Sequence, residues 1–93
     1  MSESGAKAAV TLGEYWLQAG QPAKAEKVLA AFTDAGTPHQ YMLARGFIAL
    51  ADSYHAQKKT YLGIEYLKSL QENYPGDDLD IHDMIAQRLK AWK

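Results

Sequence analysis

The sequence predicts an all-α fold of about five helices. Apolar residues recur at spacings of three and four along most of the chain, and no segment alternates with period two for long enough to form a strand. Glycine or proline separates most of these periodic segments. Four of the segments pair into two antiparallel helical hairpins and a fifth follows them, so we expect one small domain over residues 1–93.

The composition excludes several classes of function. A content of 47% hydrophobic and 23% charged residues is typical of an ordered soluble domain. A net charge of -1 gives no basic surface for nucleic acid or an anionic membrane. The absence of cysteine excludes disulfides, thiolate metal sites and a cysteine nucleophile. The apolar runs are too short to cross a membrane, and the first ten residues lack the apolar core of a signal peptide, so we expect no membrane insertion.

The first helix is predicted over about residues 6–19. The preceding segment, MSESG, has no apolar periodicity and is expected to form a frayed leader. Gly20 ends the helix because glycine readily adopts the left-handed conformation of a helix cap, and Pro22 suits the first turn of the next helix. The apolar stripe of this first helix is expected to consist of Ala9, Leu12, Trp16 and Ala19.

The second and third helices are predicted over about 22–35 and 38–57. One face of the second carries Ala25, Val28, Leu29 and Phe32. Gly36 ends it, and Thr37-Pro38-His39-Gln40 has the pattern of a capping box that would begin the third helix. The third helix has an apolar face that is too wide for one seam, so we expect it to contact neighbours on two sides. That face carries Tyr41, Leu43, Phe47, Leu50, Ala51 and Tyr54.

The fourth and fifth helices are predicted over about 60–73 and 78–92. Tyr74-Pro75-Gly76 separates them, and Asp77 or Asp78 provides the N-cap of the fifth. The fourth carries Tyr61, Ile64, Leu67 and Leu70 on its apolar face, and the fifth carries Ile81, Met84, Ile85, Leu89 and Trp92.

The two predicted hairpins repeat each other at a constant offset of 38 positions, which separates Trp16 from Tyr54 and Leu29 from Leu67. At this offset, Leu12-Gly13, Trp16, Ala25, Leu29 and Phe32 correspond to Leu50-Ala51, Tyr54, Gly63, Leu67 and Leu70. Small residues are expected where two helices approach closely, and large ones beside that contact.

This pattern resembles the tetratricopeptide repeat. In that family a small residue at position 8, an aromatic at 11, a small residue at 20, a large apolar residue near 24 and a proline near 32 recur every 34 residues. These places are filled by Gly13, Trp16, Ala25 and Leu29 in the first unit, and by Ala51, Tyr54, Gly63, Leu67 and Pro75 in the second. The chain departs from the pattern at Pro38, which comes one place late, at Phe32, where a small residue is usual, and in its longer period.

The resemblance covers about residues 8–76. It implies two repeats, over about 6–36 and 38–75, with a capping helix over about 78–92, in a right-handed superhelical stack. The segments TPHQYMLARGFIALADSYHAQ and YLKSLQENYPGDD also resemble the C-terminal repeats of large bacterial tetratricopeptide proteins of the cell envelope. That resemblance implies a fragment with a periplasmic or envelope-associated location; without it, we expect a cytoplasmic one.

In this family, extended peptides or partner helices bind the inner face of the first helix of each repeat. The resemblance therefore implies a protein-binding groove at Lys7, Val10, Glu14, Leu17 and Gln18 in the first unit and at Arg45, Ile48, Asp52 and His55 in the second. The family's clamp for the C-terminal carboxylates of chaperones is absent, because its Lys and Asn positions hold Val10 and Glu14, then Ile48 and Asp52. The alternative is that these residues are solvated or partly buried and bind nothing.

The sequence predicts no metal, cofactor or catalytic site. His39, His55 and His82 are not spaced as ligand pairs on a helix, and the acidic run DDLDIHD lacks the glycine and terminal glutamate of a calcium loop. Neither a Gly-rich phosphate loop nor a nucleophile elbow occurs.

The sequence therefore predicts a noncatalytic module for protein–protein interaction and scaffolding. Two alternatives remain: a structural end-cap of a longer helical solenoid that binds no ligand of its own, and an accessory domain of an enzyme. A core of this size cannot bury all of Tyr15, Tyr41, Tyr61, Tyr66 and Trp92, so some are expected to form an interface. Such an exposed repeat face would allow homo-oligomers to form.

Overall fold

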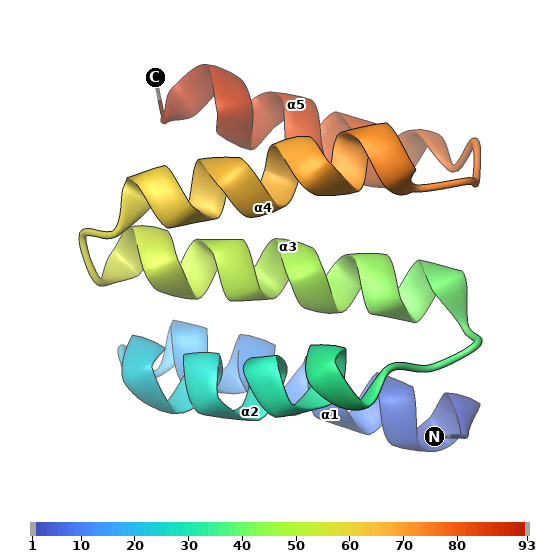
Figure 1. Ribbon diagram of the computed structural model, residues 1–93. Coiled ribbons are helices and arrows are strands. Elements are labelled where there is room, and N and C mark those ends of the chain that lie inside the picture. Colours follow the sequence, from blue (N-terminus) through green and yellow to red (C-terminus); the bar gives the residue numbers. More distant parts are fainter. Residues whose placement is uncertain (1, 93) are drawn as a thin grey trace.

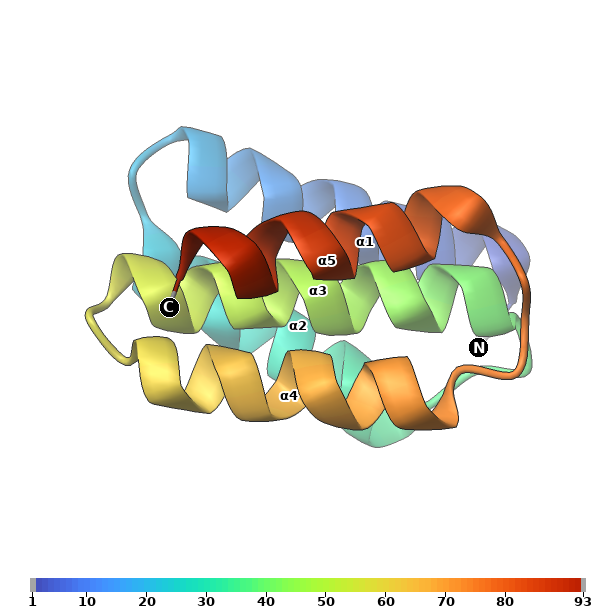
Figure 2. The same cartoon turned by 90° about the horizontal axis from the view of Figure 1, so that it is seen from above.

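The computed structural model describes residues 2–92, which contain five α-helices and no strand, and this confirms the all-α prediction. The helices are α1 (Glu3–Gln18), α2 (Pro22–Ala35), α3 (Gln40–Ala56), α4 (Thr60–Asn73) and α5 (Leu79–Ala91). Successive helices run antiparallel and form a stack, with α1 and α5 toward opposite ends (Figure 1). Seen from above, α1 and α5 lie on one side of α3, and α2 and α4 lie on the other (Figure 2).

The predicted starts of two helices were wrong. Helix α1 begins at Glu3, because the Ser2 hydroxyl caps it by accepting a hydrogen bond of 3.1 Å from the Gly5 amide. Residues 2–5 are therefore not a frayed leader, and Met1 lies outside the described residues. Helix α3 begins at Gln40, with His39 as its N-cap, and not at Pro38. The Thr37 hydroxyl accepts from the His39 amide at 3.2 Å, and this local turn precedes the helix.

Helix α3 is the central element, because it packs against all four other helices. The expectation that it contacts neighbours on two sides is therefore confirmed. Its buried positions are mostly small or aliphatic: Ala44, Gly46, Ile48, Ala49, Leu50, Ala51 and Ser53. Small side chains allow neighbouring helices to approach α3 from several directions.

Two glycines mark the closest approaches to α3. The Phe32 ring of α2 lies against Gly46, where an added Cβ would come within 2.5 Å of the ring. Gly46 thus leaves space for the large Phe32 side chain. In α4, an added Cβ at Gly63 would lie 2.9 Å from the backbone oxygen of Ala51, so α3 and α4 meet there as predicted.

The buried face of α1 differs from the predicted stripe. Ala6, Val10 and Gly13 are buried, whereas Leu12 is 44% exposed and Ala19 is also exposed. Both sets fit the spacing of a helix. Of the predicted stripe, Ala9 and Trp16 are partly buried and do pack against the core. The predicted core position of Leu12 was therefore wrong.

The turn between α1 and α2 has the cap geometry predicted for Gly20, which adopts a left-handed φ of 74°. Its amide donates to the Leu17 carbonyl at 3.2 Å, and the Gln21 amide donates to the Trp16 carbonyl at 2.8 Å. These two bonds satisfy backbone carbonyls at the end of α1 that have no partner within the helix.

The turn between α3 and α4 repeats this geometry 38 positions later. Lys58 has a φ of 65°, and its amide donates to the His55 carbonyl at 3.0 Å. The Lys59 amide donates to the Tyr54 carbonyl at 2.8 Å. The offset found in the sequence therefore also relates the backbone of the two turns, with a lysine in the place of the first turn's glycine.

Replacement of Lys58 by glycine is expected to stabilise the protein. A side chain in the left-handed region costs about 1–2 kcal/mol, and the extra entropy of glycine in the unfolded chain offsets part of that gain. We expect the free energy of unfolding of Lys58→Gly to rise by about 0.5–1 kcal/mol in urea denaturation. The reciprocal variant Gly20→Lys should be less stable than the wild type; equal or lower stability of Lys58→Gly would contradict the strain at this turn.

Truncation of Leu67 is expected to destabilise the core. Leu67 is fully buried against Ala51 of α3 and against Ile81 and Ile85 of α5. Leu67→Ala should lower the free energy of unfolding by about 2–5 kcal/mol, because it leaves a cavity in this cluster. The matched control is Leu79→Ala, at a leucine that is 76% exposed, and it should change stability by less than about 0.5 kcal/mol. Similar unfolding curves for the two variants would contradict this core.

Candidate functional site

We call the surface of α1, α3 and α5 that carries Glu14, Arg45, Asp52 and His55 the A face. The predicted groove residues are more widely placed. Two of them do not line a groove: Val10 and Ile48 are each 1% exposed and belong to the core. Ile48 packs with Ile81 and Ile85, so α5 lies on the part of α3 that was expected to bind a partner. The expectation that Val10 and Ile48 face a ligand is therefore corrected.

An ion pair joins α1 to α3 on the A face. The Arg45 guanidinium donates to the Glu14 carboxylate at 2.8 Å, with both side chains partly exposed. This hydrogen bond raises the pKa of Arg45 above its ordinary value, against the opposing effect of partial burial. Arg45 also contacts the Tyr41 hydroxyl, which donates to Asp80 of α5. A polar chain thus runs from α1 across α3 to α5.

A second ion pair joins α3 to α5. Arg88 donates from Nε to Asp52 Oδ1 at 2.7 Å and from Nη2 to Oδ2 at 3.0 Å, which is the two-bond geometry of a guanidinium on a carboxylate. Arg88 also donates to the Met84 carbonyl at 3.1 Å. Asp52, a predicted groove residue, is therefore occupied by a neighbour within the chain.

The remaining predicted residues have mixed environments. The His55 ring stacks on Trp92 with centroids 4.3 Å apart, and its Nδ1 lies 2.9 Å from the Thr60 hydroxyl. Leu17 is partly buried, whereas Lys7 and Gln18 are exposed. The structure thus brings Arg45 to Glu14 and leaves Gln18 at the end of α1, so the nine residues do not form one open groove.

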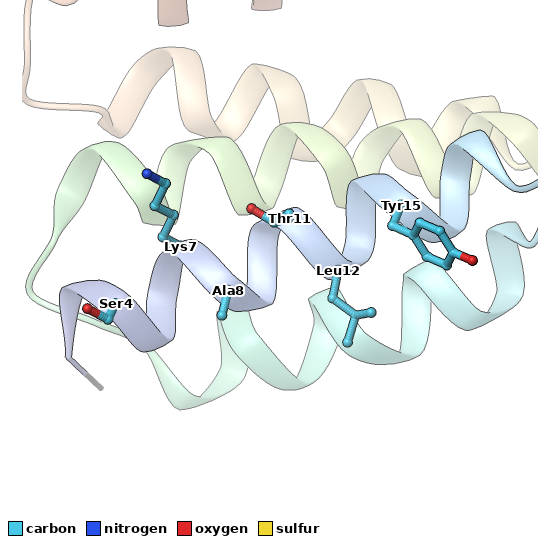
Figure 3. Close-up of a pocket in the computed structure, with 6 residues that line it drawn as sticks. All are labelled: Ser4, Lys7, Ala8, Thr11, Leu12 and Tyr15. Atoms are coloured by element: carbon cyan, nitrogen blue, oxygen red, sulfur yellow. The ribbon is translucent and has the colours of Figure 1, made fainter.

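A different surface is apolar and uncovered. Figure 3 shows six side chains along the outer side of α1, with no other helix in front of them. We call this surface the α1 strip; it consists of Ser4, Lys7, Ala8, Thr11, Leu12 and Tyr15, which line a shallow hollow. Leu12 is 44% exposed and Tyr15 is 58% exposed. The other exposed large apolar residues in 2–92, Tyr61 and Leu79, lie on different helices, so the α1 strip is where such residues cluster.

The α1 strip has a buried counterpart in α3. At the offset of 38 positions, Ala8, Thr11, Leu12 and Tyr15 correspond to Gly46, Ala49, Leu50 and Ser53. All four of these α3 residues are buried, and Ala49 and Leu50 pack with Ala25 and Leu29 of α2. The face that α3 uses for helix packing is therefore the face that α1 leaves exposed.

Sequence reasoning identified Tyr15 as a possible interface residue and Lys7 as a groove residue, but it missed Ser4, Ala8, Thr11 and Leu12. It placed Leu12 on the apolar stripe of the first helix because of its helical spacing from Ala9 and Trp16, and the repeat offset then related Leu12 to Leu50. The offset was correct; the difference is that α3 has a helix on that side and α1 has none in residues 2–92. The repeat offset therefore related the exposed face of α1 to the buried face of α3. To tell which of the two faces is covered, one must know which helix lies at the centre of the fold.

Aromatic side chains gather where α4 crosses α3. The Tyr66 ring stacks on Phe47 and on Tyr54, with centroids 6.1 and 5.5 Å apart. Burial raises the pKa of Tyr54 to about 12, and the neighbouring Tyr66 adds to this shift. Burial likewise raises the pKa of Tyr74 to about 12, with a contribution from its hydrogen bond to Asp78.

Two further findings concern the described part of the chain. No group of three or more His, Asp or Glu side chains there is arranged to hold a metal ion. None of its helices is long and apolar enough to cross a membrane.

Comparison of the sequence with protein-family models and with curated proteins, and of the structure with solved structures, gives no match.

The pair between Asp52 and Arg88 is expected to couple α3 to α5 measurably. In a double-mutant cycle of Asp52→Ala and Arg88→Ala, we expect a coupling energy of about 1 kcal/mol in thermal or urea unfolding, because the pair is bidentate and its side chains are only 27% and 25% exposed. The same cycle on Glu14 and Arg45, whose contact has a single short bond, should give a smaller value. A coupling energy near zero for Asp52 and Arg88 would show that this pair does not hold α5.

Proposed function

We propose that this chain is a noncatalytic protein–protein interaction module built from tetratricopeptide-like repeats, and that it binds its partner through the α1 strip. The observation that carries this proposal is the exposure of Leu12 and Tyr15 on one face of one helix. Exposed apolar residues that cluster on a small folded chain typically belong to an interaction surface. A partner that covered them would gain the burial energy of a leucine and a tyrosine.

The A face is a weaker candidate, because its charged groups already have partners. A ligand that bound there would compete with Glu14 for Arg45 and with Arg88 for Asp52. If a ligand broke a partly buried ion pair and did not replace the lost bonds, each charge would stay partly desolvated without a partner, which costs free energy. A partner on the α1 strip would break no such ion pair, because Lys7 is the only charged residue of the strip and takes part in neither pair.

The repeat character rests on local geometry. The turn at Lys58 reproduces the turn at Gly20 at the offset of 38 positions, and the small residues Gly46 and Gly63 lie at close approaches between helices. These features favour a repeat architecture in which each helical pair packs on the next through equivalent faces.

One observation favours the end-cap alternative. Helix α5 covers the end of the stack opposite α1, with Ile81 and Ile85 fully buried against α3 and α4. In this alternative, the α1 strip receives preceding helices of a longer solenoid, and the chain binds no separate ligand.

A binding comparison of two exposed tyrosines tests the interaction module. Tyr15→Ser lies in the α1 strip, and Tyr61→Ser changes a tyrosine that is 66% exposed on α4. We expect Tyr15→Ser to lose most of the protein captured by the immobilised wild-type chain from an extract of the cells that make it, and Tyr61→Ser to retain it. The two variants should melt within a few degrees of the wild type.

Three outcomes would reject this assignment. Equal capture by both variants would remove the α1 strip from the interface. Loss of capture in His55→Ala, with Tyr15→Ser unaffected, would place binding on the A face. Absence of any captured protein would favour the end-cap.

A further inference from the structure

A hollow lies between α4 and α5, at the end of the stack opposite α1 and α2 (Figure 1). Its volume is about 530 Å³, and it is lined by Ile64, Lys68 and Gln71 of α4 and by Ala86, Leu89 and Lys90 of α5. Helix α5 approaches α4 less closely than α3 does, and this leaves room for the hollow. Its lining shares no residue with the α1 strip.

The polar groups that line this hollow have no partner in the described part of the chain. Lys68, Gln71 and Lys90 are exposed, and their side chains make no ion pair or hydrogen bond within residues 2–92. Glu65 and Glu72 lie on either side of Lys68 along α4, but neither of them lines the hollow. All three lining groups can donate hydrogen bonds, and two of them are cations. The hollow is therefore suited to an acceptor that carries negative charge.

The rest of the lining is apolar. Ile64 and Leu89 are partly buried, and Ala86 adds only a methyl group. An apolar side chain that entered the hollow would leave water and contact these three residues, which is favourable. The hollow thus combines an apolar floor with cationic side chains.

More positive charge lies at one end of the hairpin that α4 and α5 form. The Trp92 ring at the end of α5 stacks on His55 and lies against Gly63, so this end of α5 is beside the turn between α3 and α4. That turn carries Lys58 and Lys59, which are both exposed. The hairpin therefore offers a local excess of lysine, although the net charge of the chain is -1.

These features discriminate between kinds of occupant. A wholly apolar helix would cover two ammonium groups without giving them partners, which costs free energy. A nucleic-acid backbone or an anionic membrane surface could contact the lysines but would leave the apolar floor unfilled, because a hollow accepts a side chain that protrudes from its partner. A protein segment with carboxylates beside a large apolar side chain satisfies both parts of the lining.

We propose that the hollow between α4 and α5 binds an acidic segment of another protein. One large apolar side chain of this segment enters the hollow, and Asp or Glu residues beside it pair with Lys68 and Lys90. The lining extends for about 10 Å from Ile64 to Gln71, at a rise of about 1.5 Å per residue, which suits two turns of a helix. This is a second contact surface, and it does not depend on the function proposed for the α1 strip.

Nuclear magnetic resonance titration of the full chain with a defined peptide tests this inference. The probe is a helical peptide that carries one leucine, with a glutamate one turn before it and another one turn after it. We expect saturable changes in the amide shifts of α4 and α5 around the hollow, and weaker binding at high salt. The same peptide with lysines in place of the glutamates, or with alanine in place of the leucine, should not bind.

Charge reversal in the hollow should weaken binding and reverse its preference. A variant with both Lys68→Glu and Lys90→Glu should raise the Kd for the glutamate peptide by at least about tenfold and should bind the lysine peptide instead. The matched control combines Lys7→Glu with Lys27→Glu on α1 and α2, which do not pack on α4 or α5, and it should leave the Kd unchanged. Ala86→Leu fills the hollow without a change of charge and should also weaken binding.

Several results would overturn the inference: no saturable shift at millimolar peptide, shifts confined to other helices, or equal weakening in the control variant. Vesicles of phosphatidylcholine and phosphatidylserine in equal amounts test a membrane surface. Binding to these vesicles that requires Lys68 and Lys90, without binding of the peptide, would overturn the choice of a protein segment. Tyr15→Ser should leave peptide binding unchanged, so a failure of the function proposed for the α1 strip is distinguishable from a failure here.

Discussion

The fold depends on a steric constraint at α3, which must contact four other helices along a cylinder of ordinary width. It meets this constraint with small side chains on several of its faces. Gly46 leaves space for the Phe32 ring, and Ala51 leaves space for the backbone of α4 at Gly63. Even the buried hydroxyl of Ser53 fits without cost, because it donates to the Leu50 carbonyl at 2.6 Å. Bulkier residues at these positions would separate the hairpins.

Local sequence determined most of the secondary structure. The bounds predicted for α2 and α4 match those observed. Gly20, Pro22 and Gly36 mark the ends of α2, whereas α4 lies between the polar run Gln57-Lys58-Lys59 and Pro75. The start of α3 was wrong because Thr37 bonds to the His39 amide two residues away, and this local turn competes with a helix cap. The buried face of α1 was wrong for another reason: apolar residues lie on several sides of that helix, and only the positions of α2 and α3 select among them.

The candidate site was harder to predict than the fold, because its contacts join residues that are distant in the sequence. Glu14 meets Arg45 and Asp52 meets Arg88 only after α3 has packed between α1 and α5. No local pattern shows that α5 lies on Ile48, since an amphipathic helix can pack on any apolar surface of suitable shape. The repeat offset did contain the information for the α1 strip. It relates Leu12 to Leu50, and a residue that is buried in an inner helix is exposed in the equivalent outer one.

Helix α5 approaches α3 and α4 less closely along its length than the other neighbouring helices approach one another. Two isoleucines and the Arg88 fork provide much of its attachment, and its connection to α4 is a loop without regular structure. We expect a helix attached in this way to open at a lower free energy than the body formed by α1, α2, α3 and α4, in which α4 packs closely on α3. Amide protons of α5 should then exchange with solvent through sub-global opening, whereas those of α3 should exchange only when the whole chain unfolds.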